Sequence, residues 1–252
     1  DVNGSGQNFV SWNWKANGQG SANTDGTINT LYTSANTTSG FSISTYTGTG
    51  SAGTIGHGLG VAPTAIWIKK TSGTENWFCW NNPMTSAGGF MKLDTNSAIS
   101  TNNTAFPWNP QANTFGVSTD AATNASGSTY VAYCFADVQG YSKMGGYVGN
   151  GNTDGTFVYT GFKPAFVMIK SRGGDNWRIL DNKRLGYNAN NSLLFPNITQ
   201  AESALTWYDL LSNGFKLRTT DSGDNTNGEN YIYMAFAEAP LVGSNNVPAN
   251  AR

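Results

Sequence analysis

The side chains that could perform acid–base chemistry are one histidine and a scattered set of carboxylates. His57 is the only histidine, and it lies between Gly56 and Gly58 with no serine or cysteine motif beside it to act as a nucleophile. Glycoside hydrolysis would require two carboxylates facing each other across the scissile bond. The carboxylates considered for that role are Glu75, Asp94, Asp154, Asp175 and Asp181. Because none of these residues stands in a recognisable catalytic pattern, we predict no catalytic residue and no enzymatic activity.

Patterns that could ligate a metal ion are equally sparse. Asp154 belongs to the string NTDG (152–155), which recurs at 23–26, and Asp-Gly is first of all a turn dipeptide. One such segment lacks the acid-rich loop that calcium usually requires. Two cysteines, Cys79 and Cys134, are too few for a zinc site. They are interpreted as buried thiols, with a single disulfide as the alternative. We therefore predict no metal and no cofactor.

Tryptophan is the residue type with the greatest potential for binding. The chain contains eight, and exposed indole faces stack on sugar rings or anchor protein contacts. Trp77 and Trp177 recur in register within two similar stretches, which favours a place in the core. The candidates for exposure and glycan stacking are the unpaired Trp80, Trp108 and Trp207, with core or inter-domain packing as the alternative.

These residues are set in a tandem repeat with an offset of about 100 positions. Residues 40–77 resemble residues 140–177, and the matched pairs include Gly40/Gly140, Tyr46/Tyr147, Pro63/Pro164, Lys69/Lys170 and Trp77/Trp177. The repeat predicts two β-rich units, at 40–138 and 139–240, after a linker at 17–39 and before a polar tail at 241–252. Glu75 and Asp175 occupy the same turn in both copies, which favours a structural role for both acids.

The segment before the linker predicts a strand at residues 9–14. Its aromatic pattern resembles the closing segments of the two repeats, at 130–136 and 231–237. Residues 1–16 are therefore interpreted as the closing strand of a preceding, missing repeat, with an isolated edge strand as the alternative.

Many short strands separated by turn signals predict an all-β fold of tandem antiparallel β-sandwiches. Residues 41–46 alternate apolar and polar side chains, as does a half-buried strand. Further strands are predicted at 64–70, 76–80, 90–93, 114–117 and 130–136, and at the corresponding places in the second copy. The rough helical spacing of Leu205 and Leu210 weakly favours a short helix at 200–211.

Composition excludes several classes of partner. Charged residues make up 12% of the chain, about half the usual share, and the net charge is −1. No cluster of Lys and Arg supplies the basic stripe of a nucleic-acid binder. No apolar run approaches the roughly 20 residues of a membrane span, so membrane insertion is not expected. A surface rich in Gly, Asn, Ser and Thr suits an extracellular or particle-bound protein.

Four strings carry a resemblance to a known family: GFSISTYTGTGSAGTIGHGLGVAPTAIWIKK, TYVAYCFADVQGYSKMGGYVGNGNTDGTFVYTGFKPAFVMIK, LLSNGFKLRT and YIYMAFAEAP. They resemble a repeat domain of virion-associated proteins of tailed bacteriophages, especially marine ones, many of them tail-fibre proteins. The resemblance covers nearly the whole chain from Phe9 to the tail. It implies lectin-like sandwiches of the concanavalin or jelly-roll kind, often in more copies, and it brings no catalytic residues with it.

The expected function is that of a non-enzymatic virion component: a tail fibre, head fibre or capsid decoration that mediates assembly or host-surface attachment. Its expected partners are other virion proteins, further copies of itself (a trimer, by analogy with fibres) and a host surface glycan, and its expected location is the virion or the extracellular space. The alternative is a carbohydrate-binding lectin that acts without a virion. A polysaccharide depolymerase is the least favoured reading, and it requires a cleft with two facing carboxylates.

Overall fold

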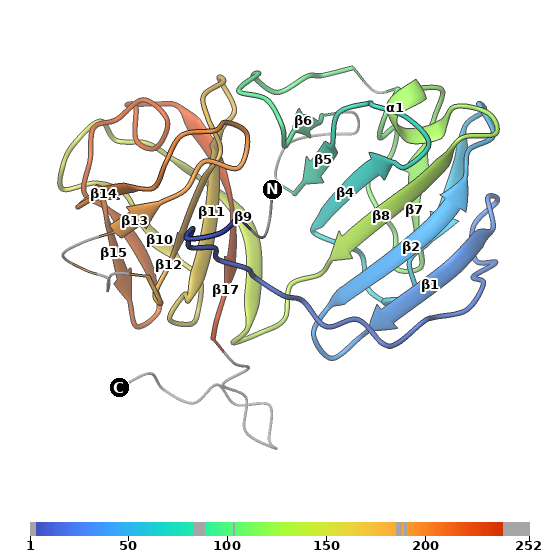
Figure 1. Cartoon of the computed structure of the whole chain (residues 1–252), viewed down its shortest axis with the longest axis horizontal. Coiled ribbons are helices and arrows are strands. Elements are labelled where there is room, and N and C mark those ends of the chain that lie inside the picture. The colour runs from blue at the N-terminus through green and yellow to red at the C-terminus, as the bar shows by residue number, and fades with distance from the viewer. Residues whose placement is uncertain (1–3, 83–88, 103, 185–187, 189–190, 239–252) are drawn as a thin grey trace.

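The computed structural model describes residues 4–82, 89–102, 104–184, 188 and 191–238. This part of the chain is nearly all β, with antiparallel sheets and one short helix, α1 (Ala121–Asn124). The all-β class and the antiparallel pairing are therefore confirmed. The strands gather into two lobes that lie side by side (Figure 1). We call them the first unit (β1–β8, residues 21–136) and the second unit (β9–β17, residues 138–238).

The first unit has a six-stranded main sheet and a two-stranded small sheet. The order in the main sheet is β1 (Thr30–Asn36), β2 (Phe41–Thr47), β8 (Thr129–Phe135), β4 (Ala65–Lys70), β5 (Phe78–Asn81), β6 (Met91–Lys92). The small sheet pairs β3 (Gly53–Gly56) with β7 (Thr114–Val117). Apolar side chains at alternate positions, such as Ile66 and Ile68 on β4, fill the core of this unit.

The second unit repeats this arrangement. Its main sheet has the order β12 (Arg178–Asp181), β11 (Phe166–Ser171), β17 (Asn230–Phe236), β9 (Ser142–Val148), which corresponds to β5-β4-β8-β2 of the first unit. Its small sheet joins β10 (Phe157–Tyr159), β16 (Gly214–Leu217) and β15 (Tyr208–Leu211), and a separate pair joins β13 (Asn191–Leu193) to β14 (Ser203–Leu205).

Buried hydrogen bonds recur at matching places in the two units. The hydroxyl of Tyr46 donates to the carbonyl of Thr123 at 2.6 Å, and that of Tyr147 donates to the carbonyl of Asp224 at 2.7 Å. Both tyrosines are buried. Tyr46 stacks on Tyr130 of β8, and Tyr147 stacks on Tyr231 of β17. The repeat in the sequence is thus matched by an equivalent hydrogen bond in each unit, at a buried place where water does not compete for the donor or the acceptor.

A third cluster of buried side chains lies between the units. It contains Phe41 and Phe135 of the first main sheet and Phe166, Met168 and Phe236 of the second, so the outward faces of the two main sheets pack against each other. Backbone and side-chain bonds add to this contact. The indole N–H of Trp177 donates to the Lys92 carbonyl at 2.8 Å, and the N–H of Ile99 donates to the Arg172 carbonyl at 2.9 Å.

Two predicted elements are wrong. Residues 9–14 form no strand; their tryptophans, Trp12 and Trp14, instead pack edge-on against rings of the inter-unit cluster. Residues 200–211 form β14 and β15 rather than a helix. Tyr208 and Leu210 are both buried, and this period of two places them in the core of the second unit. The predicted linker at 17–39 includes β1, and the predicted tail at 241–252 lies outside the described residues.

Candidate functional site: a groove between the two units

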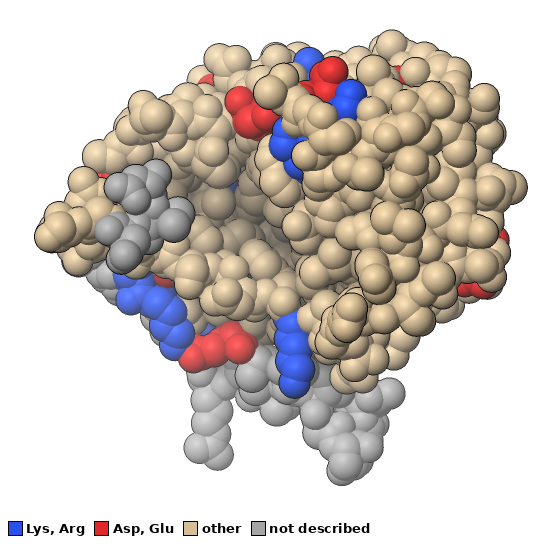
Figure 2. Space-filling model, turned by 45° about the vertical axis from the view of Figure 1, so that its right-hand side comes forward, with Lys and Arg blue, Asp and Glu red and all other residues tan. Residues whose placement is uncertain are grey.

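A hollow lies between the two units. It consists of two pockets of about 300 Å³ each, and Trp12, Asn13 and Trp14 line both of them. We call this hollow the inter-unit groove. The surface is hollowed between its two halves, and most of the residues around the hollow are uncharged (Figure 2). The groove is therefore suited to an uncharged or weakly charged ligand.

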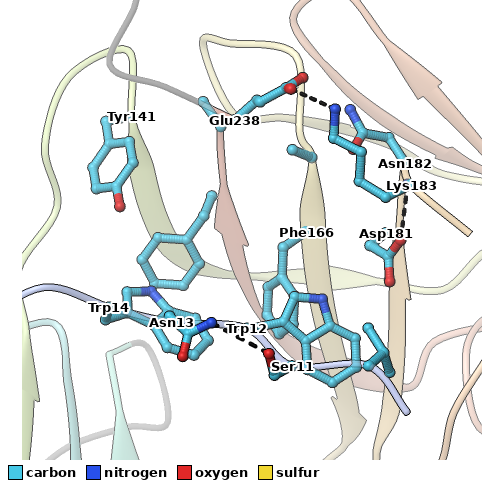
Figure 3. A pocket seen from close by; sticks show the side chains of 14 residues that line it. Ser11, Trp12, Asn13, Trp14, Tyr141, Phe166, Asp181, Asn182, Lys183 and Glu238 are labelled. Carbon is cyan, nitrogen blue, oxygen red and sulfur yellow. Dashed lines mark hydrogen bonds and ion pairs between the residues drawn. The ribbon is translucent and has the colours of Figure 1, made fainter. Parts of the chain in front are cut away.

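The pocket on the side of the second unit combines aromatic and polar side chains. Trp12 lies edge-on to Phe166 with ring centroids 5.5 Å apart, and the Arg184 guanidinium lies 5.8 Å from the centre of the Trp12 ring. Asp181 ends β12 and is followed by Asn182 and Lys183 on one side, and Tyr141 lies across from them (Figure 3). The remaining lining residues are Val10, Ser11, Asn13, Trp14, Ala165, Phe236, Ala237 and Glu238.

The pocket on the side of the first unit is lined mainly by aromatic side chains. It is formed by the outward face of the first main sheet, where Trp67 of β4 lies 5.2 Å from Phe135 of β8 and Trp77 stacks on Tyr133 at 5.9 Å. Phe41, Ile43 and Leu93 complete it together with residues 12–14. Trp67 and Trp77 are half-buried, so each keeps part of its indole exposed to the groove.

The charged groups of the groove neutralise one another. Burial disfavours the charge on Asp181, but hydrogen bonds from Arg184 (Nε to Oδ2, 2.7 Å) and from two backbone N–H groups hold its pKa below the ordinary value. Glu238 pairs with Lys183, whose hydrogen bond lowers the pKa of Glu238. Both carboxylates are therefore ionised and paired at neutral pH.

The three tryptophans predicted to stack on glycans are dispersed, and none lines the groove. Trp80 is only 4% exposed and lies in the core of the first unit, so its predicted exposure is wrong: β5 buries both of its faces. Trp108 is 47% exposed, and its ring lies against Gly116 of β7, where an added Cβ would come within 2.2 Å of it. Trp207 is half-buried and lies against Arg178, with the guanidinium 5.4 Å from its ring.

Sequence reasoning missed the tryptophans that do line the groove. Trp12 and Trp14 were assigned to a strand, and Trp77 was assigned to the core because it recurs as Trp177. Of that pair only Trp177 is fully buried, at 1% exposed. A signal was present in the closing strands, whose apolar residues occupy both faces, as at Tyr133 and Phe135 on the outward face of β8. Such a face requires a cover, and the cover here is incomplete.

His57 and the cysteines serve the structure. His57 is fully buried, its Nδ1 accepts a hydrogen bond from the Leu59 N–H, and its Nε2 lies 3.1 Å from the Gln111 carbonyl oxygen. Burial also lowers the pKa of His57, so the imidazole is neutral. Both cysteines are free and buried, as interpreted from the sequence. Cys134 belongs to the core of the first unit and Cys79 to the inter-unit cluster, on opposite faces of one sheet, so the disulfide alternative is wrong.

The carboxylates considered for hydrolysis or calcium have other partners. Asp154 pairs with Lys216 at 2.8 Å and with Arg218 at 3.1 Å, and the bond from Lys216 lowers its pKa. Asp94 accepts a hydrogen bond from the Trp77 N–H at 3.3 Å. Glu75 and Asp175 share a backbone role, because their carbonyl oxygens accept hydrogen bonds from the ammonium groups of equivalent lysines, Lys69 and Lys170. Within the described residues, no three His, Cys, Asp or Glu side chains gather in a way that could hold a metal ion.

One ionic cluster is enclosed in the second unit. Arg178 contacts Asp224 directly and Asp221 at 2.7 Å, with Asp175 at 3.7 Å. Burial raises the pKa of Asp224 to about 6, with Arg178 opposing that rise. In the first unit Phe78 takes the place of Arg178 on the corresponding strand. Asp224 and Arg178 are both buried, so we interpret their ion pair as part of the core of the second unit.

Comparison with known proteins identifies a family. Residues 1–240 match the family model described as a domain of unknown function (DUF7483), and the chain belongs to that family. No curated protein matches the chain, and neither does any solved structure. Among the helices of the described residues, none is long and apolar enough to cross a membrane.

Proposed function

We propose that this protein is a non-enzymatic component of a bacteriophage virion, in a tail fibre, head fibre or capsid decoration, that contacts the host surface through the inter-unit groove. The observation that carries the contact role is the groove itself, in which half-buried indoles from three segments of the chain face a common hollow. The assignment to a virion is supported by the resemblance of the repeats to phage particle proteins. Assembly with other virion proteins and with further copies of the chain belongs to the same proposal.

Each unit is, in this proposal, a β-sandwich of the concanavalin or jelly-roll kind, and the two stand in tandem. A main sheet and a small sheet enclose one core in the first unit, and the second unit repeats the order of the main strands. A rigid pair of sandwiches suits a particle surface, because it presents a binding face without requiring a mobile loop.

A binding role fits the groove better than hydrolysis. Two carboxylates, Asp181 and Glu238, do line one pocket, but each is paired with a cation and has a lowered pKa. A glycosidase needs one carboxylic acid with a raised pKa to protonate the leaving group. We therefore place the depolymerase reading last.

Association with particles tests the proposal. Antibodies raised against the purified chain are used to follow it through density-gradient purification of phage lysates and by immunogold electron microscopy of intact particles. We expect the chain to band with particles and gold to mark one structural feature of them. Recovery of the chain in the soluble fraction alone, with unlabelled particles, would sink the assignment to a virion.

A lectin that acts without a virion is the second candidate, and the aromatic lining of the groove favours it. It predicts the same binding to sugars but no association with particles. The gradient experiment separates the two candidates, because a lectin of this kind would remain in the soluble fraction while retaining its affinity for glycans.

A further inference from the structure

We infer that the pocket on the side of the second unit is a binding site for an uncharged saccharide, with Trp12 as its stacking platform. This inference rests on the proposed attachment function and names the ligand class and the site. It moves the sugar site from Trp80, Trp108 and Trp207 to the segment at residues 11–14 and the end of β12.

The shape and lining of this pocket are those of a small-ligand site. Its volume of about 300 Å³ lies at the lower end of the range for such sites. Trp12 is half-buried, so part of its indole is available to the apolar face of a sugar ring. Phe166 lies edge-on to the indole and the Arg184 guanidinium lies 5.8 Å from its ring centre, and both contacts hold the indole in place. The pocket thus offers a fixed aromatic platform, which costs a ligand little ordering of the protein.

Hydrogen-bonding groups surround the platform on two sides. The Ser11 hydroxyl and the Asn13 amide are exposed on the same segment as Trp12, and the Asn13 amide donates to Ser11 at 3.3 Å. Tyr141 directs its hydroxyl toward the pocket from the opposite side, and Asn182 lies beside β12 (Figure 3). Hydroxyls and amides can both donate and accept, as sugar hydroxyls do, so they match a carbohydrate without a fixed proton arrangement.

The charges select against acidic ligands. Asp181 is satisfied by Arg184 and Lys183 is satisfied by Glu238, so the lining residues present no unpaired cation to a uronate or a sulfate. A neutral hexose or N-acetylhexosamine is therefore the ligand class that the pocket fits.

The test is binding of the isolated full chain to an array of neutral hexose and N-acetylhexosamine oligosaccharides, printed beside uronate-containing and sulfated ones. The strongest neutral hit is then titrated by calorimetry. We expect Trp12→Ala to weaken binding about tenfold, since a lost stacking contact is worth on the order of 1.4 kcal/mol. Trp108→Ala is the matched control, because it removes an exposed indole outside the groove, and we expect unchanged affinity.

Asn13→Ala supplies a second variant that keeps all the aromatic packing. We expect it to weaken binding about fivefold through loss of a ligand hydrogen bond, with an unchanged melting temperature. If Trp12→Ala does not fold, as judged by near-UV circular dichroism, the affinity of Asn13→Ala for the neutral glycan tests the inference in its place. Three outcomes would overturn the inference: no binding to any neutral glycan, a preference for acidic glycans, or loss of binding in Trp108→Ala while Trp12→Ala, or Asn13→Ala in its place, binds fully. Because no particle enters these assays, their outcome is independent of the gradient experiment that tests the virion assignment.

Discussion

Removing the guanidinium of Arg178 should destabilise the second unit strongly and in a pH-dependent way. Arg178 is 5% exposed, and the side chains around it include Asp224, Asp221 and Trp207. Arg178→Met keeps much of the apolar stem and deletes the charge. Asp224 then remains as a buried carboxylate without its principal cation, an arrangement that typically costs about 3–5 kcal/mol of unfolding free energy.

The pH dependence follows from the pKa of Asp224. Burial raises this pKa from 3.8 to about 6 in the folded protein, with Arg178 opposing the rise. The folded state therefore binds a proton more tightly than the unfolded state, and the contribution of Asp224 to stability is greatest below pH 3.8 and is lost as the pH rises through 6. That contribution amounts to about 3 kcal/mol. Without Arg178 the pKa should rise further, so the deficit of Arg178→Met should be large at pH 8 and smaller at pH 5.

Urea denaturation monitored by tryptophan fluorescence at pH 8 and pH 5 measures both effects. Asp224→Asn is the matched variant, since it removes the buried charge while keeping the shape, and Arg178→Met/Asp224→Asn should regain at least half of the stability lost by Arg178→Met at pH 8. We expect Arg178 to stabilise the buried charge of Asp224. A loss of unfolding free energy in Arg178→Met below about 1 kcal/mol at pH 8, or one that does not shrink at pH 5, would refute that role.

Three further outcomes follow from buried groups. Tyr46→Phe and Tyr147→Phe should each cost about 1–2 kcal/mol by urea denaturation, and by similar amounts, because each deletes the same buried hydrogen bond in its own unit; unequal losses of more than about 1 kcal/mol would contradict that equivalence. Cys79 and Cys134 should react with Ellman's reagent only after denaturation, since burial raises the pKa of both thiols; rapid reaction of the native protein would place a thiol at the surface. Gly116→Ala should force the adjacent indole off β7, cost about 1–3 kcal/mol and shift the tryptophan emission, and an unchanged spectrum would argue against that contact.

The strands were the most predictable part of this fold. Alternation in residues 41–46 and the apolar run at 64–70 correspond to β2 and β4, because in both places the burial of side chains and the β period agree. The helix weakly favoured at residues 200–211 is wrong, because there the local spacing and the long-range pairing disagree. Two leucines at rough helical spacing are outweighed by the pairing of β15 with β16, a contact between segments that local spacing does not reveal.

The candidate site was less predictable, because it is made by the packing of the units on each other. Trp77 and Trp177 occupy equivalent positions in the sequence repeat, yet Trp177 is enclosed by the facing unit and Trp77 borders the groove. No periodicity within one unit distinguishes them, since the difference lies in what the other unit covers. The same holds for Trp12, which packs on the ring of Phe166 in the second unit, more than 150 positions away in the chain.

The groove follows from the way in which the two units cover each other. A β-sheet that covers a core with one face usually exposes polar residues on the other, but here β8 and β17 are apolar on that outward face, with Phe135 and Phe236. Each unit therefore requires a partner over its main sheet, and the units meet there. Trp12 and Trp14 alternate with polar residues in the segment at 11–14. Trp14 packs on Phe135 and Phe236, and Trp12 packs on Phe166. Where this aromatic cover ends, half-buried indoles remain open to water, so the groove arises from the packing of the two repeated units and needs no added loop.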